Sequence, residues 1–187
     1  MSEYIFSQFF NIFNNEESGV NWELANQINN HITKDEENIP FELSNNEINY
    51  EQIFRVIELK SEEINKNEPR PREITFLTPK EYGQWFIKSI KHFNFENIDS
   101  PELSLFGGMG GNNIKSSIFG MQFGNLAGLL GKFSWGLSQF GLILPQSSTL
   151  GINQKNFNTK ITSFEADESD LTLGLFAIEY TTLCLGV

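Results

Sequence analysis

The segment Phe119-Gly120-Met121-Gln122-Phe123-Gly124-Asn125-Leu126-Ala127-Gly128 decides how the chain packs. Glycine recurs at every fourth position, and in a helix this spacing aligns Gly120, Gly124 and Gly128 along one side. Each glycine inside a helix costs about 1 kcal/mol of helix propensity relative to alanine. The strip is therefore favourable only where another helix or backbone packs closely against it. We expect residues 114–144, which carry only two charged side chains, to form a buried, glycine-rich helical hairpin.

Helical patterns flank this segment on both sides. Asn21 is suited to cap a helix that runs to about Thr33, and capping boxes at residues 44–47 and 78–81 begin two further helices. Acidic residues at 167–170 suit the first turn of a final helix, which we expect from about Ser169 to the end of the chain. No alternation of apolar and polar residues is long enough to predict a sheet. The sequence therefore predicts an all-α fold, a multi-helix bundle that includes the glycine-rich hairpin.

The chain divides into three parts by composition. Residues 1–18 are expected to form a flexible N-terminal arm, residues 19–104 an N-terminal helical region, and residues 105–187 the glycine-rich hairpin and the last helix. In a helical arm, four phenylalanines would share one apolar side, at positions 6, 9, 10 and 13. This stripe fits either an unstructured, adhesive arm or a helix that docks on a partner or on the rest of the domain.

The composition restricts the classes of function. The chain has 187 residues and a formal net charge of −11, and its 13 Lys and Arg residues do not cluster, so we expect no nucleic-acid partner. The single Cys184 excludes a disulfide framework and a cysteine-based zinc site, and His31 and His92 are too few for a three-histidine metal site. Residues 1–15 contain neither the basic region nor the small-residue cleavage site of a secretory signal, so the expected compartment is the cytoplasm.

Glu179 is the residue that most suggests chemistry, because it stands alone in the apolar stretch 171–185. A carboxylate in such a helix must find a partner, reach solvent or become protonated. One interpretation is a general base whose pKa is raised by burial. The other is a carboxylate that lies at the helix surface or is hydrogen-bonded for structural reasons.

Three groups of segments carry a resemblance to a known family. Residues 20–28 (Val-Asn-Trp-Glu-Leu-Ala-Asn-Gln-Ile) are similar to its early helix, and residues 77–82 are similar to the start of its tryptophan-bearing helix. Residues 119–127 and 141–145 resemble its glycine-helix segment and the turn that follows. Together they resemble the zincin-like metallopeptidase family of actinobacteria, which has a branch associated with coenzyme F420 biosynthesis. The resemblance implies that residues 105–187 hold part of a zincin-like domain.

The same resemblance aligns the family's metal helix with residues 173–183. A zincin carries two histidines at i and i+4, which bind zinc, beside a glutamate that activates water. The matching positions here are Ile178, Glu179 and Thr182, so the glutamate is retained and both histidines are replaced. The resemblance implies Glu179 as the family-equivalent general base. It implies zinc as the cofactor of the family, although we expect this chain to bind none.

Three functions stay open. The first is a zincin-like protein without zinc-dependent activity, which binds a peptide or protein partner or a second copy of itself. The second is an active zinc-dependent peptidase or other hydrolase, which uses Glu179 with ligands from a missing C-terminal part. The third is a membrane-associated glycine-zipper protein. Polar residues such as Gln122 and Lys132 and the absence of flanking positive charge make a membrane location the least expected of the three.

Overall fold

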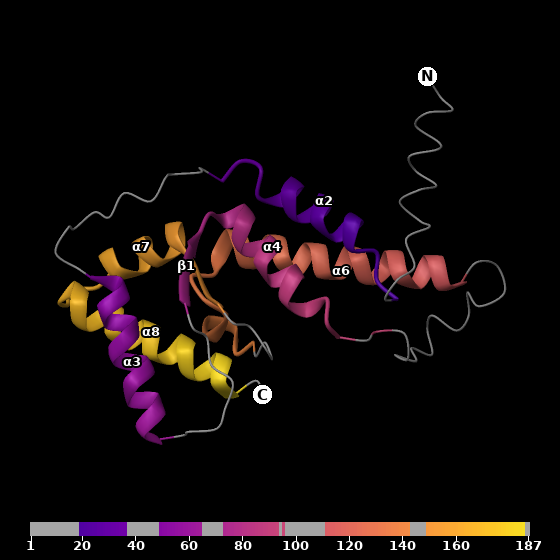
Figure 1. The fold of residues 1–187 in the computed structure, drawn as a ribbon. Coiled ribbons are helices and arrows are strands. Elements are labelled where there is room, and N and C mark those ends of the chain that lie inside the picture. Colours follow the sequence, from indigo (N-terminus) through magenta and orange to yellow (C-terminus); the bar gives the residue numbers. More distant parts are fainter. Residues whose placement is uncertain are drawn as a thin grey trace.

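The computed structural model describes residues 19–36, 49–64, 73–93, 95, 111–142 and 149–185. These ranges form a fold of helices with one small sheet (Figure 1), which confirms the predicted multi-helix, largely α-helical architecture. The elements are α2 (Trp22–Ile32), α3 (Tyr50–Ile64), β1 (Glu73–Leu77), α4 (Pro79–Ile90), α6 (Gly111–Phe133), the 3-10 helix η1 (Leu137–Phe140), β2 (Thr149–Asn153), α7 (Gln154–Thr162) and α8 (Glu168–Leu185). The N-terminal arm at 1–18 and the capping box at 44–47 lie outside the described residues.

Helix α6 is the longest element, and α2 and α4 pack along it (Figure 1). A Cβ atom built on Gly124 would lie 2.7 Å from the carbonyl oxygen of Ala25, and Gly120 and Gly128 likewise face α2. The expectation that another helix packs closely on the glycine strip is thus confirmed. That helix comes from the N-terminal region and is not a second arm of a hairpin, because α6 ends at Phe133 and the chain then turns into the short η1.

The expectation that the chain forms no sheet was wrong, because the described residues include one sheet of two strands. Strand β1 pairs with β2 in parallel, in a register that runs from Glu73 opposite Thr149 to Leu77 opposite Asn153. Each strand has only five residues. Strand β2 is buried along most of its length, so it lacks the alternation of a half-exposed strand. Its Gly151 packs against the ring of Trp85, which brings α4 onto the sheet.

Local capping signals fix where the helices begin. The side chain of Asn21 accepts a hydrogen bond from the Leu24 amide at 2.9 Å, and Thr78 and Glu81 complete the predicted capping box of α4. Asp167 accepts hydrogen bonds from the first turn of α8. The starts of these three helices therefore follow the sequence prediction to within one residue.

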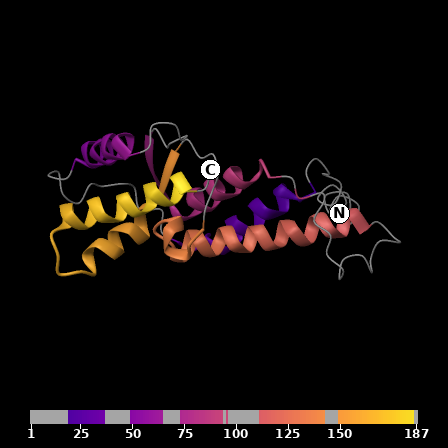
Figure 2. The same cartoon turned by 90° about the horizontal axis from the view of Figure 1, so that it is seen from below.

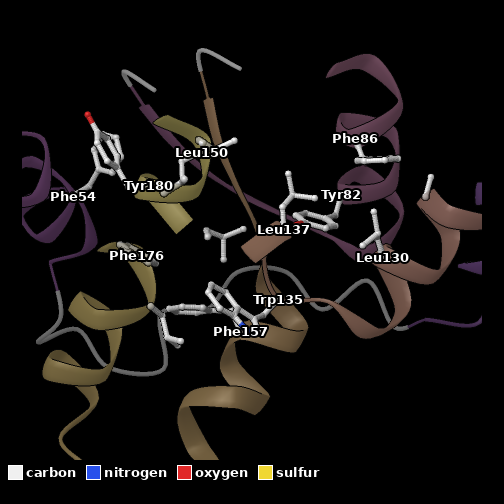
Figure 3. Packing of buried hydrophobic residues seen from close by; sticks show 14 of the residues in the cluster. Phe54, Tyr82, Phe86, Leu130, Trp135, Leu137, Leu150, Phe157, Phe176 and Tyr180 are labelled. Carbon is white, nitrogen blue, oxygen red and sulfur yellow. The ribbon is translucent and has the colours of Figure 1, made fainter. Parts of the chain in front are cut away.

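The core beyond the C-terminal end of α6 is built largely from aromatic rings (Figure 3). The ring centroids of Phe157 and Phe176 lie 5.3 Å apart, and those of Phe54 and Tyr180 lie 5.8 Å apart. These rings come from α3, α7 and α8, so residues from both the 19–104 and the 105–187 parts share one core. Figure 2 shows the resulting elongated shape, with α6 leading away from the end where α7 and α8 lie side by side.

Candidate functional site

Glu179 lies on the inner side of α8 and has no exposed surface. Its two carboxylate oxygens are both engaged. Oε1 accepts a hydrogen bond from the backbone amide of Leu137 at 2.7 Å, and Oε2 accepts one from the backbone amide of Ser138 at 2.9 Å. Glu179 therefore holds α8 against the segment that follows α6.

The start of η1 explains why a carboxylate is needed at this position. The first amides of a helix have no acceptor within that helix, and an anion is favoured at its positive end. Gly136, which precedes η1, offers no side-chain cap. Glu179 supplies the missing acceptor from 42 residues away along the chain. A Cβ atom at position 136 would lie 2.5 Å from Glu179 Oε2, so glycine is needed there for the carboxylate to approach.

The electrostatic balance at Glu179 favours the neutral acid relative to a carboxyl group in water. Burial raises its pKa above the ordinary value, and the hydrogen bonds from Ser138 and Leu137 oppose that shift without cancelling it. Burial, and after it the charge of Glu179, also raises the pKa of Tyr82 well above its ordinary value. The Tyr82 phenol therefore stays protonated beside the carboxyl group.

Further polar side chains, buried or partly buried, hold the segment between α6 and η1 in place. The Asn153 side chain donates to the carbonyl of Gly131 at 2.6 Å, and the Asn156 side chain donates to the carbonyl of Ser134 at 2.9 Å. The Ser134 hydroxyl donates to the Gly136 carbonyl within the same segment. These contacts supply hydrogen-bond partners for backbone carbonyls at and after the end of α6. The Glu179 site is therefore a place where several elements are joined for structural reasons.

The positions that the resemblance aligns with zinc ligands do not form a ligand set. Ile178 points outward and is 54% exposed, while the Thr182 hydroxyl donates to the carbonyl of Ile178 at 2.9 Å. His31, in the last turn of α2, and His92, two residues after the end of α4, are both exposed. Within the described ranges, no three histidine, cysteine or acidic residues come together in a way that could hold a metal ion. The side chains of Ile178 and Thr182 therefore do not fit zinc, whose usual protein ligands are cysteine, histidine and carboxylates.

The predicted structural glycines lie in a different place from Glu179. Gly120, Gly124 and Gly128 form the seam between α6 and α2, where residues of α2 and its cap Asn21 cover them. A bilayer-spanning helix needs about 20 mainly apolar residues. None of the helices that the structure describes has both the length and the apolar character for this.

Sequence reasoning identified Glu179 and missed the groups that it binds. Those groups are backbone amides, which every residue except proline has, so the residue types do not reveal them. Gly136 was a signal that could have been used, because a glycine often marks a place where another group approaches the backbone closely.

Comparisons of the chain with models of known families, with curated proteins and with solved structures found no match. The resemblance to the zincin-like family therefore stays a prediction that depends on the segments quoted above.

Proposed function

We propose that this chain is a cytoplasmic, zincin-like protein that has no zinc-dependent activity and acts by binding a protein partner. The resemblance supports the family, and the geometry of Glu179 supports the absence of hydrolysis. The observation that carries the proposal is the pair of hydrogen bonds, at 2.7 and 2.9 Å, that commits both carboxylate oxygens to backbone amides of η1.

The competing hydrolase would need Glu179 in another role. A general base must lie within hydrogen-bond reach of the water or group from which it takes a proton. Glu179 has no exposed surface, and its acceptor positions face the start of η1. Ligands from elsewhere would not change this, because the carboxylate would first have to release η1.

The proposal predicts that the purified chain holds no stoichiometric zinc. The protein is incubated with zinc at neutral pH and passed into zinc-free buffer, and the metal content per chain is measured by mass spectrometry. We expect far less than one zinc per chain for the wild type, for Glu179→Gln and for the control Glu165→Gln, which changes an exposed acid before α8.

One zinc per chain in the wild type would instead contradict the proposal. Because a glutamate that activates water is not itself a zinc ligand, Glu179→Gln and Glu165→Gln would then both retain the metal, and the hydrolase would be supported by a chelator-sensitive activity that Glu179→Gln alone abolishes. Circular dichroism shows whether each variant is folded. If Glu179→Gln does not fold, the wild-type stoichiometry decides the question without it.

The outer side of α8 supports a binding role. Leu173 is 39% exposed and Ile178 is 54% exposed. Gly174 lies between them, and a Cβ atom there would meet nothing within 4 Å. From residue 171 to residue 184 the only Asp, Glu, Lys, Arg or His residue is the buried Glu179. An uncharged helix face with small residues allows close packing of another helix.

We infer that the partner at this face is a second copy of the chain. Two molecules with a formal net charge of −11 each repel one another, so a contact between copies requires a surface without charged side chains. The outer side of α8 lets them approach without juxtaposing charges. The same patch from each molecule would then form a two-fold symmetric contact.

Ile178→Asp is expected to abolish this self-association, because it places two carboxylates at the centre of the contact. Sedimentation velocity over a range of concentrations should show a rising mean mass for the wild type and a constant monomer mass for the variant. Val56→Asp, at a position that is 45% exposed on α3, is the matched control and should behave as the wild type does. A wild type that stays monomeric at every concentration would refute the second copy as partner.

A further inference from the structure

A second group of aromatic rings lies at the end of α6 that is remote from Glu179. It consists of Trp22, Phe93, Phe95, Phe119 and Phe123, and we name it the α2–α6 aromatic cluster. Ring centroids lie 4.9 Å apart for Phe95 and Phe123, and 5.7 Å apart for Trp22 and Phe123. Phe93 is 40% exposed, and the other four rings are partly exposed. The cluster therefore presents aromatic surface at the edge of the core, against which Trp22 and Phe123 pack.

The described chain begins beside this cluster. Gly19 has a positive φ of 70°, Val20 is buried, and the Asn21 amide donates to the Ser116 carbonyl at 2.9 Å. These contacts fix the point at which residues 1–18 join the domain, only a few residues before Trp22. Gly19, to which residues 1–18 are joined, therefore lies three residues before Trp22 of the cluster.

The length of residues 1–18 keeps their phenylalanines close to the cluster. Residues 14–18 separate Phe13 from Gly19, and five extended residues span at most about 18 Å. A short connection between two interacting parts of one chain gives an effective concentration in the millimolar range. A contact that would be weak between separate molecules is then well populated within one chain.

We propose that residues 1–18 dock on the α2–α6 aromatic cluster of the same chain through the phenylalanine stripe. Phe6, Phe9, Phe10 and Phe13 follow the spacing of one helical side, and aromatic pairs gain from edge-to-face and offset contacts. This inference is independent of the role of Glu179.

Hydrogen exchange of the full-length chain, followed by mass spectrometry, tests the docking. We expect amides of residues 4–13 to exchange at least about tenfold more slowly than in a synthetic peptide of residues 1–18. Phe9→Ser with Phe10→Ser should restore the peptide rate. Phe95→Ser, which alters the cluster at a position outside the helices, should do the same. Phe133→Ser, at an exposed position on the far end of α6, is the control and should leave the protection intact.

The docking is refuted if residues 4–13 of the wild type exchange at the peptide rate, or if Phe95→Ser leaves their protection unchanged. Protection that disappears on dilution would show that the segment binds a second molecule, and it would overturn docking within one chain. Retained helical circular dichroism in each variant ensures that unfolding is not the cause of any loss.

Discussion

Replacement of Gly124 by alanine is expected to lower the free energy of unfolding by about 1 to 3 kcal/mol, even though alanine is the better helix former. The added methyl group would lie 2.7 Å from the carbonyl oxygen of Ala25 and 2.9 Å from the Cβ of Ile28. The Ala25 backbone cannot move aside without separating α2 from α6. The strain of overpacking therefore exceeds the gain of up to about 1 kcal/mol in helix propensity.

The same substitution at Gly174 is the matched control, because it also changes glycine to alanine inside a long helix. Nothing lies within 4 Å of a Cβ atom at that position. Gly174→Ala should therefore raise the free energy of unfolding by about 0.5 to 1 kcal/mol. Urea unfolding followed by circular dichroism measures both changes. Equal signs for the two variants would contradict the close packing of α2 on α6.

The parts of the fold that the sequence predicted are those governed by neighbouring residues. The capping box of α4 joins Thr78 to Glu81, and the cap of α2 joins Asn21 to Leu24, so both lie within a few residues of their partners. The glycine spacing in α6 is local in the same sense, and it correctly predicted a closely packed surface. It carried no information on which helix would cover that surface, because α2 is distant in sequence.

The two strands show where sequence reasoning fails. Residues 73–77 and 149–153 are short, and each forms a strand only because the other lies beside it. Parallel pairing requires a long crossover connection, here one that contains α4 and α6, so no turn signal marks the pair. A pattern of period two could not reveal β2, since it is buried along most of its length.

The candidate site, like the fold, could be predicted only in part. The apolar surroundings of Glu179 required that its carboxylate find a partner, reach solvent or become protonated, and the structure supplies a partner. The identity of that partner depended on the path of residues 134–138 after α6. Such a path follows from tertiary packing, and the residue types of Leu137 and Ser138 do not encode it.

The structural role of Glu179 predicts a large cost for its removal. Glu179→Ala leaves the buried Leu137 amide and the partly buried Ser138 amide without acceptors, and we expect a loss of about 2 to 4 kcal/mol in the free energy of unfolding. Glu179→Gln keeps one acceptor but turns an amide group toward the other backbone donor, so a loss of about 1 to 3 kcal/mol is expected at acidic pH. Glu165→Gln, which changes an exposed acid, should alter the stability by less than about 0.5 kcal/mol.

The pH dependence of the Glu179→Gln penalty distinguishes burial from hydrogen bonding as the dominant influence. Because burial raises the pKa of Glu179 in the folded state, the folded protein binds this proton more tightly than the unfolded chain does. The contribution of Glu179 to stability is then complete below the unfolded pKa. It declines as the pH rises to the folded pKa, with a slope of at most about 1.4 kcal/mol per pH unit, and stays constant above it.

Glutamine does not titrate, so the difference in unfolding free energy between the wild type and Glu179→Gln should shrink as the pH rises from about 4, near the pKa of a free carboxyl group. All other carboxyl groups are common to both proteins and cancel in this difference. A difference that grows with pH would mean that the two backbone hydrogen bonds outweigh burial and that Glu179 is ionised more readily in the folded state than in water.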